Sequence, residues 1–357
     1  MTITTITLDP WAASSMLQKA IRRGEPNLAL LAAHEFQRHR GKGVWRRLLN
    51  IAAEDVGIAD PALVLEVARF AANPQLRLVL GPDGDLLDEL VERLAVAPKD
   101  RSVDYLYCAA IRHPDGLAAK ANLASLQAGE LLTVAANLEE PILRRAVATL
   151  HACTQGDAIR TGSIEPLCRL LEGTRKGEAT IALCDAVRLA GPKAAHPFIL
   201  MLPILASVLD QYGSPPDVVN SVVPEARYAR GVPLYAFDKH TRVGKQAIIE
   251  FAHMSPGLAS ALEQVPADRR RDVALMAAFY ADGVPISRRF AWGQSAQLEQ
   301  LGFEADMGIA GCPELSCVPI LECVRANLPD LDQIRLAIFT RSSMRIARVQ
   351  SIALLTR

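Results

Sequence analysis

The stretch WRRLLNIAAEDVGIADP, residues 45–61, decides the fold expected for the first part of this chain. Its apolar residues recur at intervals of three and four, which is typical of an amphipathic α-helix. Those residues are Trp45, Leu48, Leu49, Ala52 and Val56. Gly57 follows them, and Asp60 before Pro61 combines a helix N-cap with proline at the first helical position. The stretch therefore predicts two helices joined by a tight corner.

Residues before and after this stretch also predict short helices, because the helix ends carry recognisable signals. Ser15 followed by Gln18 matches a capping box, and Gly24 stands where that helix should end. Further helices are expected to begin at Asp85 and Asp100. The first hundred residues are therefore expected to form a series of short helices.

The rest of the chain also favours an all-α protein. Aromatic residues make up only 5% of the sequence, and this scarcity favours helix over sheet. Between residues 117 and 212, glycine and proline separate helical segments whose lengths suggest stacked helical hairpins. Two segments near the C-terminus, 334–340 and 344–355, contain β-branched residues, and short strands or helix remain as alternatives there.

Charge and cysteine content indicate the environment of the protein. The formal net charge is zero, so any binding to nucleic acid must come from a local patch. The seven cysteines form no dense framework, which fits a reducing cytosol. The N-terminus lacks the features of a signal peptide, and the longest apolar stretch, 197–209, is too short to span a membrane. We therefore expect a cytoplasmic protein.

Three segments, in a fixed order, carry a resemblance to a known family. They are SSMLQKAIRRGEPNLAL at 14–30, WRRLLNIAAEDVGIADP at 45–61 and LAVAPKDRSVDYL at 94–106. Over about residues 14–115, the chain resembles the C-terminal tetramerisation region of the replication-associated recombination protein A family, whose members are clamp-loader-like AAA+ proteins. The resemblance implies a helical collar-like domain, a homotetramer, and action at stalled replication forks and DNA ends.

Two departures limit what this resemblance implies. No phosphate-binding sequence G-x-x-x-x-G-K-[ST] occurs, and the run Gly41, Lys42, Gly43 is no substitute for it. The family's later Tyr-x-Tyr-Pro-His segment is not recognisable either. We therefore expect no ATPase activity and no cofactor, and a separately encoded ATPase is a candidate partner.

The resemblance and the turn signals together suggest three regions. Residues 1–115 are expected to form the collar-like oligomerisation domain, 116–213 the helical hairpins, and 214–357 a C-terminal domain. The sequence GSPP at 213–216 is the strongest linker candidate between the last two regions.

A basic cluster between residues 19 and 47 is the first candidate binding site. Together with a lysine from a later loop, the candidates for contact with DNA phosphates are Arg22, Arg23, Arg46, Arg47 and Lys99. The alternative is a solvated helical face, or ion pairs with the acidic stretch 83–92. Glu54 and Asp55 are expected to serve the local structure as caps and as partners of neighbouring arginines.

The segment DKHTR at 238–242 is the second candidate site. Thr241 is expected to cap the helix that follows. Lys239, His240 and Arg242 beside that helix start would suit a phosphate or carboxylate ligand. Asp238 and His240 are the candidates for acid–base chemistry. The alternative is a structural knot of ion pairs that fixes the loop to the helix.

The cysteines of CPELSCVPILEC, residues 312–323, do not predict a metal site. Their gaps are longer than those of zinc knuckles, and no convincing fourth ligand follows. We expect Cys312, Cys317 and Cys323 to be buried free thiols, and we expect no bound metal.

Two functional hypotheses follow from these observations. The first is a helical oligomeric scaffold without ATPase activity, associated with DNA replication, recombination or a related processing or defence machine. The alternative is an enzyme, or a nucleotide- or phosphate-binding protein, that uses residues 238–242. A pocket lined by this segment would favour the second hypothesis, and burial of the segment under other elements would favour the first.

Overall fold

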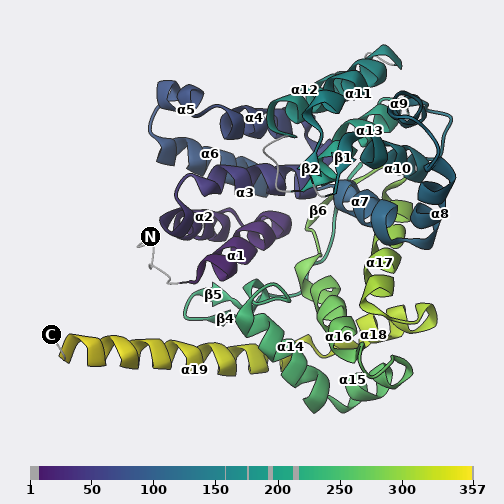
Figure 1. Ribbon diagram of the computed structural model, residues 1–357. Coiled ribbons are helices and arrows are strands. Elements are labelled where there is room, and N and C mark those ends of the chain that lie inside the picture. Colours follow the sequence, from purple (N-terminus) through teal and green to yellow (C-terminus); the bar gives the residue numbers. More distant parts are fainter. Residues whose placement is uncertain (1–7, 157, 175–176, 192–195, 212–216, 356–357) are drawn as a thin grey trace.

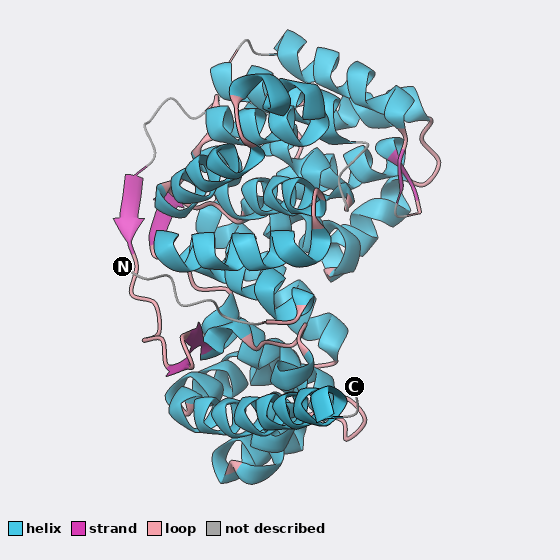
Figure 2. Cartoon of the chain, turned by 90° about the vertical axis from the view of Figure 1, so that its left-hand side faces the viewer, coloured by secondary structure: helices cyan, strands magenta, loops and turns pink. Residues whose placement is uncertain are grey.

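A computed structural model describes residues 8–156, 158–174, 177–191, 196–211 and 217–355 of the chain (Figure 1). Helices dominate these residues and strands are confined to short pairs, so the predicted all-α class is confirmed (Figure 2). Side chains are described as far as Arg341.

The helices are short and follow one another closely along the chain. In the first part they are α1 (Pro10–Arg23), α2 (Pro26–Arg40), α3 (Gly43–Ile51), α4 (Pro61–Ala72), α5 (Pro74–Leu80), α6 (Asp83–Val96) and α7 (Ser102–Arg112). The middle part contains α8 (Pro114–Leu123), α9 (Ala128–Ala136), α10 (Ile142–Cys153), α11 (Thr161–Thr174), α12 (Glu178–Ala190) and α13 (Met201–Leu209). The last part contains α14 (Arg242–Met254), α15 (Pro256–Ala261), α16 (Arg270–Ala278), α17 (Ser295–Ala310), α18 (Glu314–Ala326) and α19 (Leu328–Leu355).

The strands form three antiparallel pairs within the described residues. These pairs are β1 (Thr154–Gln155) with β2 (Ala158–Ile159), β3 (Asp217–Asn220) with β6 (Arg288–Ala291), and β4 (Tyr228–Ala229) with β5 (Val232–Pro233). The two segments 334–340 and 344–355, for which strand was an alternative, both lie in the helix α19. Leu331, Arg335 and Ile338 are buried at helical spacing there, and that burial favours the helix over a strand.

The ends of three predicted helices need correction. Asp9 caps α1, because its carboxylate accepts hydrogen bonds from the backbone of Trp11 and Ala12, and the predicted cap Ser15 lies inside the helix. The helix expected to begin at Asp85 begins two residues earlier, and α7 begins two residues after Asp100. The predicted end of α1 is confirmed, since Gly24 adopts a left-handed conformation with φ +72°.

The predicted corner within residues 45–61 is also confirmed. Helix α3 continues into a π-helical turn, η1 (Ala52–Val56), and Gly57 then reverses the chain with φ +51°. The carboxylate of Asp60 accepts a hydrogen bond from the backbone N–H of Leu63 and so caps α4. The sequence did not predict the π-helical turn, which carries Glu54 and Asp55 toward the interior of the molecule.

One continuous hydrophobic core joins the three regions expected from the sequence. Helix α1 packs against α2 and α6, α12 packs against α4, and α17 packs against α7. The approach of α17 to α7 is close, because a Cβ added at Gly302 would lie 2.7 Å from the ring of Tyr105. The C-terminal helices α14, α16 and α18 lie below the larger group of helices in Figure 1. The linker candidate 213–216 lies outside the described residues.

In the part of the chain that the structure describes, no single helix has the length and apolar character needed to cross a membrane. Helices α17 and α18 reach the required length and apolar character only when they are taken together, and they are bent by 97° relative to each other.

Candidate functional site

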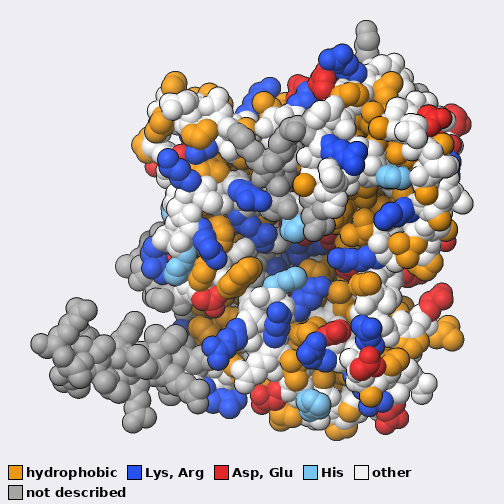
Figure 3. Space-filling view, in the orientation of Figure 1, with side chains coloured by type: hydrophobic (Ala, Val, Ile, Leu, Met, Phe, Trp, Pro, Cys, Tyr) orange, Lys and Arg blue, Asp and Glu red, His pale blue; other side chains and the backbone are white. Residues whose placement is uncertain are grey.

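A cavity of about 460 Å³ lies where α1, α3 and α7 face the loop before α14 and the π-helical turn η7 (Phe279–Gly283) after α16. We call it the interior cleft. Its polar lining includes Gln18, Arg47, Asn50, Glu54, Asp104 and Lys239. Figure 3 shows lysine, arginine and histidine side chains gathered around a hollow near the middle of this face. Segments far apart in the sequence therefore meet at one site.

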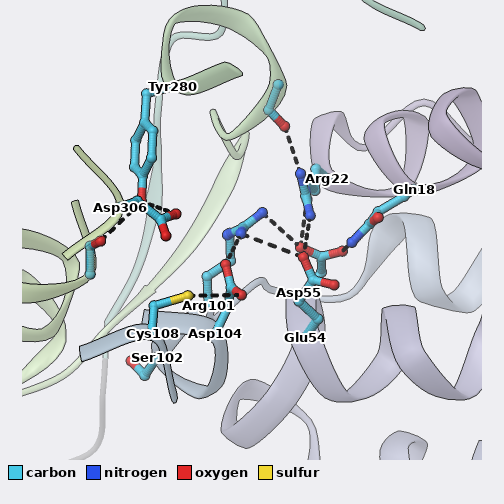
Figure 4. A network of polar contacts seen from close by, with 12 residues as sticks. Gln18, Arg22, Glu54, Asp55, Arg101, Ser102, Asp104, Cys108, Tyr280 and Asp306 are labelled. Carbon is cyan, nitrogen blue, oxygen red and sulfur yellow. Dashed lines mark hydrogen bonds and ion pairs between the residues drawn. The ribbon is translucent and has the colours of Figure 1, made fainter. Parts of the chain in front are cut away.

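A buried ion-pair network forms one wall of the interior cleft (Figure 4). Asp55 is fully buried, and its Oδ1 lies 2.5 Å from Arg22 Nε and 3.3 Å from Arg101 Nη1. Gln18 donates a hydrogen bond of 2.8 Å to the other oxygen of Asp55. Glu54 pairs with the same two arginines, at 2.6 Å and 3.5 Å. The predicted pairing of these two acids with arginines is therefore confirmed, whereas the predicted capping is wrong, since no described backbone N–H donates to either carboxylate.

A second group of polar residues connects α7 with α17. Arg112 Nη1 lies 2.6 Å from Asp306 Oδ1, and the hydroxyl of Tyr280 donates to the other oxygen of Asp306 at 3.1 Å. Asp104 pairs with Arg101 and accepts a weak hydrogen bond from the thiol of Cys108 (Figure 4). Burial raises the pKa of Cys108 well above its ordinary value, so this cysteine is a neutral thiol and a poor nucleophile.

Asp238, the acid of the DKHTR segment, forms an ion pair with Lys19 of α1. Its Oδ2 lies 2.8 Å from Lys19 Nζ, which also donates to the carbonyl of Tyr235 at 2.6 Å. Burial by itself would raise the pKa of Asp238, but the charges of Lys19 and His240 and two hydrogen bonds lower it to about 2. Asp238 is therefore a fixed anion and not a proton carrier near neutral pH.

The other residues of the segment have different surroundings. Thr241 caps α14 as predicted, since its hydroxyl accepts from the backbone N–H of Gly244 at 3.0 Å. The Nζ of Lys239 lies 4.3 Å from the centre of the Phe279 ring, and burial lowers its pKa. His240 contacts Asp238 through its backbone N–H, at 2.9 Å, so the imidazole and that carboxylate form no relay there. Asp238, Lys239 and His240 all line the interior cleft, and Asp238 is in addition an ion-pair knot with α1. Lining of a pocket by this segment is the observation that favours the ligand-binding hypothesis over a purely structural segment.

A wide surface groove of about 930 Å³ leads into the interior cleft. We call it the outer groove, and its lining is Trp11, His240, Arg242, Lys245, Gln246, Ile249 and Glu250. The last five of these residues lie on one face of α14, at spacings of one and two helical turns. Trp11, from the first turn of α1, is 65% exposed. Trp11 and His240 line both the outer groove and the interior cleft, so the two are continuous.

The five candidates for DNA contact do not share one basic face. Arg22 and Arg23 are buried, and Arg23 lies over the ring of Tyr235 with 4.5 Å to its centre. Lys99 is 1% exposed and donates to the carbonyls of Ala95 and Ala97. Arg46 is exposed, and Arg47 lines the interior cleft. Arg47 donates to Gln18 and to the carbonyl of Ser14, so four of the five candidates have internal partners, and three of these four are buried.

Several residues of the site were not singled out from the sequence. They are Trp11, Gln18, Asn50, Asp104, Arg112, Lys245 and Asp306. No sequence signal separates the exposed Trp11 from a core tryptophan such as Trp45, which is also near a helix start. Asp306 had none, because its contact with Arg112 joins residues separated by 194 positions.

The C-terminal cysteines fit their predicted role in part. Cys312 and Cys317 are buried, and Cys323 is half-buried. Across the described residues, no group of three or more His, Cys, Asp or Glu side chains could hold a metal ion.

The comparisons with known proteins identify no relative of this chain. No family model matches the chain, and neither a curated protein nor a solved structure matches it significantly.

Proposed function

We propose that this chain is a DNA-associated helical scaffold protein without ATPase activity, and that it binds single-stranded nucleic acid in the outer groove. The observation that carries the proposal is an exposed tryptophan that shares the groove with two exposed cations. Trp11 forms one side of the groove, and Arg242 and Lys245 lie on the other. This combination of a stacking surface with a basic wall is what sequence-independent binding of single strands requires.

The cations of the groove are available to a ligand. Arg242 and Lys245 are both exposed and lie three residues apart on α14. Among the described residues, neither forms an ion pair with a carboxylate. Both belong to the first turn of α14, whose N-terminus carries partial positive charge of its own. Glu250, the acid in the groove lining, lies about 12 Å further along the helix. A phosphate backbone would therefore be attracted to the start of α14.

The tryptophan favours a single strand over a duplex. The indole of Trp11 projects from the start of α1, where Pro10 and the Asp9 cap fix the backbone. A base can stack on such a ring only if it is free of its neighbours, as in a single strand. A neutral protein also lacks the overall field that would hold a duplex by charge alone.

The test measures fluorescence anisotropy of a labelled single strand and of the matching duplex over a range of salt concentrations. We expect salt-sensitive binding of the single strand. Substitution of Arg242 and Lys245 by Glu should weaken it for every sequence and flatten its salt dependence. Trp11→Ala should weaken binding about tenfold or more, because stacking contributes about 1–3 kcal/mol per base.

Matched controls separate a local effect from a change in net charge. Lys42 and Lys120 are exposed and lie outside the groove, so replacing both by Glu makes the same charge change elsewhere. We expect this control to retain most of the affinity. Preference for the duplex, absence of salt-sensitive binding, or equal loss in the control would each contradict the proposal.

We also propose that the scaffold is a homo-oligomer assembled through residues 14–115. This part of the proposal is supported by an exposed apolar surface on α5, within the region that resembles a tetramerisation region. Leu78, Val79 and Leu80 are consecutive and are 70%, 83% and 58% exposed. Three exposed apolar side chains at the end of one helix make this end a candidate contact surface. The occupant we propose is a second copy of the chain.

Light scattering of the purified protein tests the assembly. We expect an oligomer for the wild type and dissociation for Val79→Glu, which would bury a charge at the contact. Leu117→Glu on α8 is the control, because Leu117 is 50% exposed outside this region. A wild-type monomer at micromolar concentration would end this part of the proposal.

A further inference from the structure

We infer that the interior cleft receives one unstacked nucleobase of the strand held in the outer groove, an inference that rests on the proposed function. The first argument is continuity. Trp11 and His240 line both spaces, so a base that leaves the stack at Trp11 has a direct path inward. The volume of about 460 Å³ lies within the roughly 300–1,000 Å³ range of small-molecule sites.

The walls of the interior cleft are suited to a flat ring. Phe279, Tyr107 and Phe198 contribute aromatic faces to its lining. The rings of Tyr107 and Phe198 meet edge to face, with their centres 6.4 Å apart. Proteins that hold a base outside its stack place it between aromatic or apolar side chains in this manner.

The polar atoms of the cleft match the edge of a base. Among the described residues, the Oδ1 of Asn50 and the Nε of Arg47 are buried without a hydrogen-bond partner. Asn50 is only 9% exposed, so the unsatisfied oxygen is costly unless a ligand supplies a donor. One atom is an acceptor and the other a donor, and a base edge presents both kinds of group.

The charges of the cleft argue against a bare phosphate as its ligand. Glu54, Asp104 and Asp306 line the same space as Arg47 and Lys239. Lys19, Arg22 and Arg112 line it as well, but each of them is already paired with a carboxylate. A phosphate would therefore meet carboxylates at close range, whereas an uncharged base would not be repelled. The phosphates of the strand are better accommodated outside, beside Arg242 and Lys245.

The experiment uses uncharged deoxynucleosides and inorganic phosphate as separate probes of the full-length protein. Saturation-transfer NMR should detect binding of at least one deoxynucleoside and no comparable competition by phosphate. Asn50→Leu should abolish that signal and weaken binding of the single strand about tenfold. If Asn50→Leu does not fold, Arg47→Met serves in its place. Thermal unfolding by circular dichroism establishes folding for each variant.

The double variant Arg242→Glu, Lys245→Glu distinguishes this inference from the proposed function. It should lose strand binding and keep the nucleoside signal, because only the phosphate contacts are removed. Failure of the wild type to bind any strand would overturn the proposed function. Strand binding without a nucleoside signal, or a nucleoside signal that both cleft variants retain, would overturn the inference alone. Competition by phosphate as strong as that by nucleosides would also overturn it.

Discussion

The interior cleft and the outer groove adjoin each other, but the charged side chains are buried and paired in the cleft and exposed in the groove. In the cleft, Asp55 is fully buried and contacts Arg22 and Arg101. In the groove, Arg242 and Lys245 are exposed, and no described carboxylate pairs with them. A buried charge without a partner is costly, whereas an exposed one is solvated at little cost. The difference indicates that the inner charges maintain the fold and that the outer ones remain available for a ligand.

Removal of the central acid of the cleft should have the largest effect on stability. Asp55→Ala would leave Arg22 and Arg101 buried with Glu54 as their shared partner, although Arg101 also keeps Asp104. Breaking a buried ion pair on one side typically costs about 3–5 kcal/mol. We expect a loss in the free energy of unfolding toward the lower end of that range, measured by urea denaturation.

The control for this variant is an acid in a surface pair. Asp185 lies 3.1 Å from Arg188, and its side chain is 43% exposed. Asp185→Asn should change the free energy of unfolding by less than about 1 kcal/mol. Equal losses for the two variants would remove the contrast between buried and exposed charges.

Lys99 extends the comparison between buried and exposed charges. It is buried like the cleft residues, but among the described residues it has no carboxylate partner. Burial lowers its pKa from 10.5 to about 7. Between these two values the unfolded chain binds a proton that the folded protein does not bind. Stability should therefore rise from pH 7 to pH 9, by up to about 1.4 kcal/mol per pH unit, and fall as the pH drops toward 7.

Urea denaturation at several pH values measures this contribution. Lys99→Met should lose a large part of the rise, whereas Lys120→Met should keep all of it, because Lys120 is exposed. Burial also lowers the pKa of Lys19 and of Lys239, so these two lysines contribute a rise of the same sign that remains in both variants. Burial raises the pKa of Asp100 to about 6, so most of its titration lies below this window. A rise that survives undiminished in Lys99→Met would assign the pH dependence to other groups.

Gly244 packs against Asp238 of the interior cleft and directly precedes Lys245 of the outer groove, so its substitution should affect both regions. A Cβ at this position would overlap the backbone of Phe237 and Asp238, which is where α14 begins against the preceding loop. Gly244→Ala should therefore displace the start of α14 and cost about 1–3 kcal/mol in the free energy of unfolding. It should also weaken strand binding, because Arg242 and Lys245 move with the helix.

Gly84 in α6 provides the matched control, since a Cβ there would meet no atom within 4 Å. Gly84→Ala should leave stability unchanged or raise it by up to about 1 kcal/mol, through reduced flexibility of the unfolded chain. Equal behaviour of the two alanine variants would show that α14 is not packed tightly at its start.

The fold could be predicted well where short-range signals dominate. Gly24 ends α1, Asp60 caps α4 and Thr241 caps α14, because each signal acts within a few residues. The cap of α1 was misplaced at Ser15, since Asp9 before Pro10 offers the stronger combination of cap and first helical residue.

The site could be predicted only in part, because its contacts are long-range. Lys239 and His240 were correctly expected to lie beside a helix start, but their position opposite α1 depends on the pair between Lys19 and Asp238. The basic cluster could not be divided into surface and buried residues, because the sequence does not reveal which arginines have buried acidic partners. Arg22 meets Asp55 across 33 positions through a π-helical turn that no sequence signal indicated.

The smallest effects on stability are expected in the outer groove, where the effects on binding should be large. His240 and Arg242 are both exposed, and no described carboxylate forms an ion pair with either side chain. The ring of His240 meets Phe279 edge to face, with 5.6 Å between ring centres, so its removal forfeits one aromatic contact. His240→Ala and Arg242→Ala should therefore each change the free energy of unfolding by less than about 1 kcal/mol.

The same two variants should lose most of the affinity for single-stranded nucleic acid, and with it the activity of the protein in its host. A cation at the start of α14 is unfavourable for the helix by itself, and a bound phosphate removes that conflict. Thermal unfolding and the fluorescence anisotropy of a labelled single strand, measured on the same preparations, show whether each residue serves binding or the fold. If either variant unfolds several degrees earlier while its affinity for the strand stays at the wild-type level, the residue serves the fold. The contrast between paired charges in the interior cleft and available charges in the outer groove would then not hold at the start of α14.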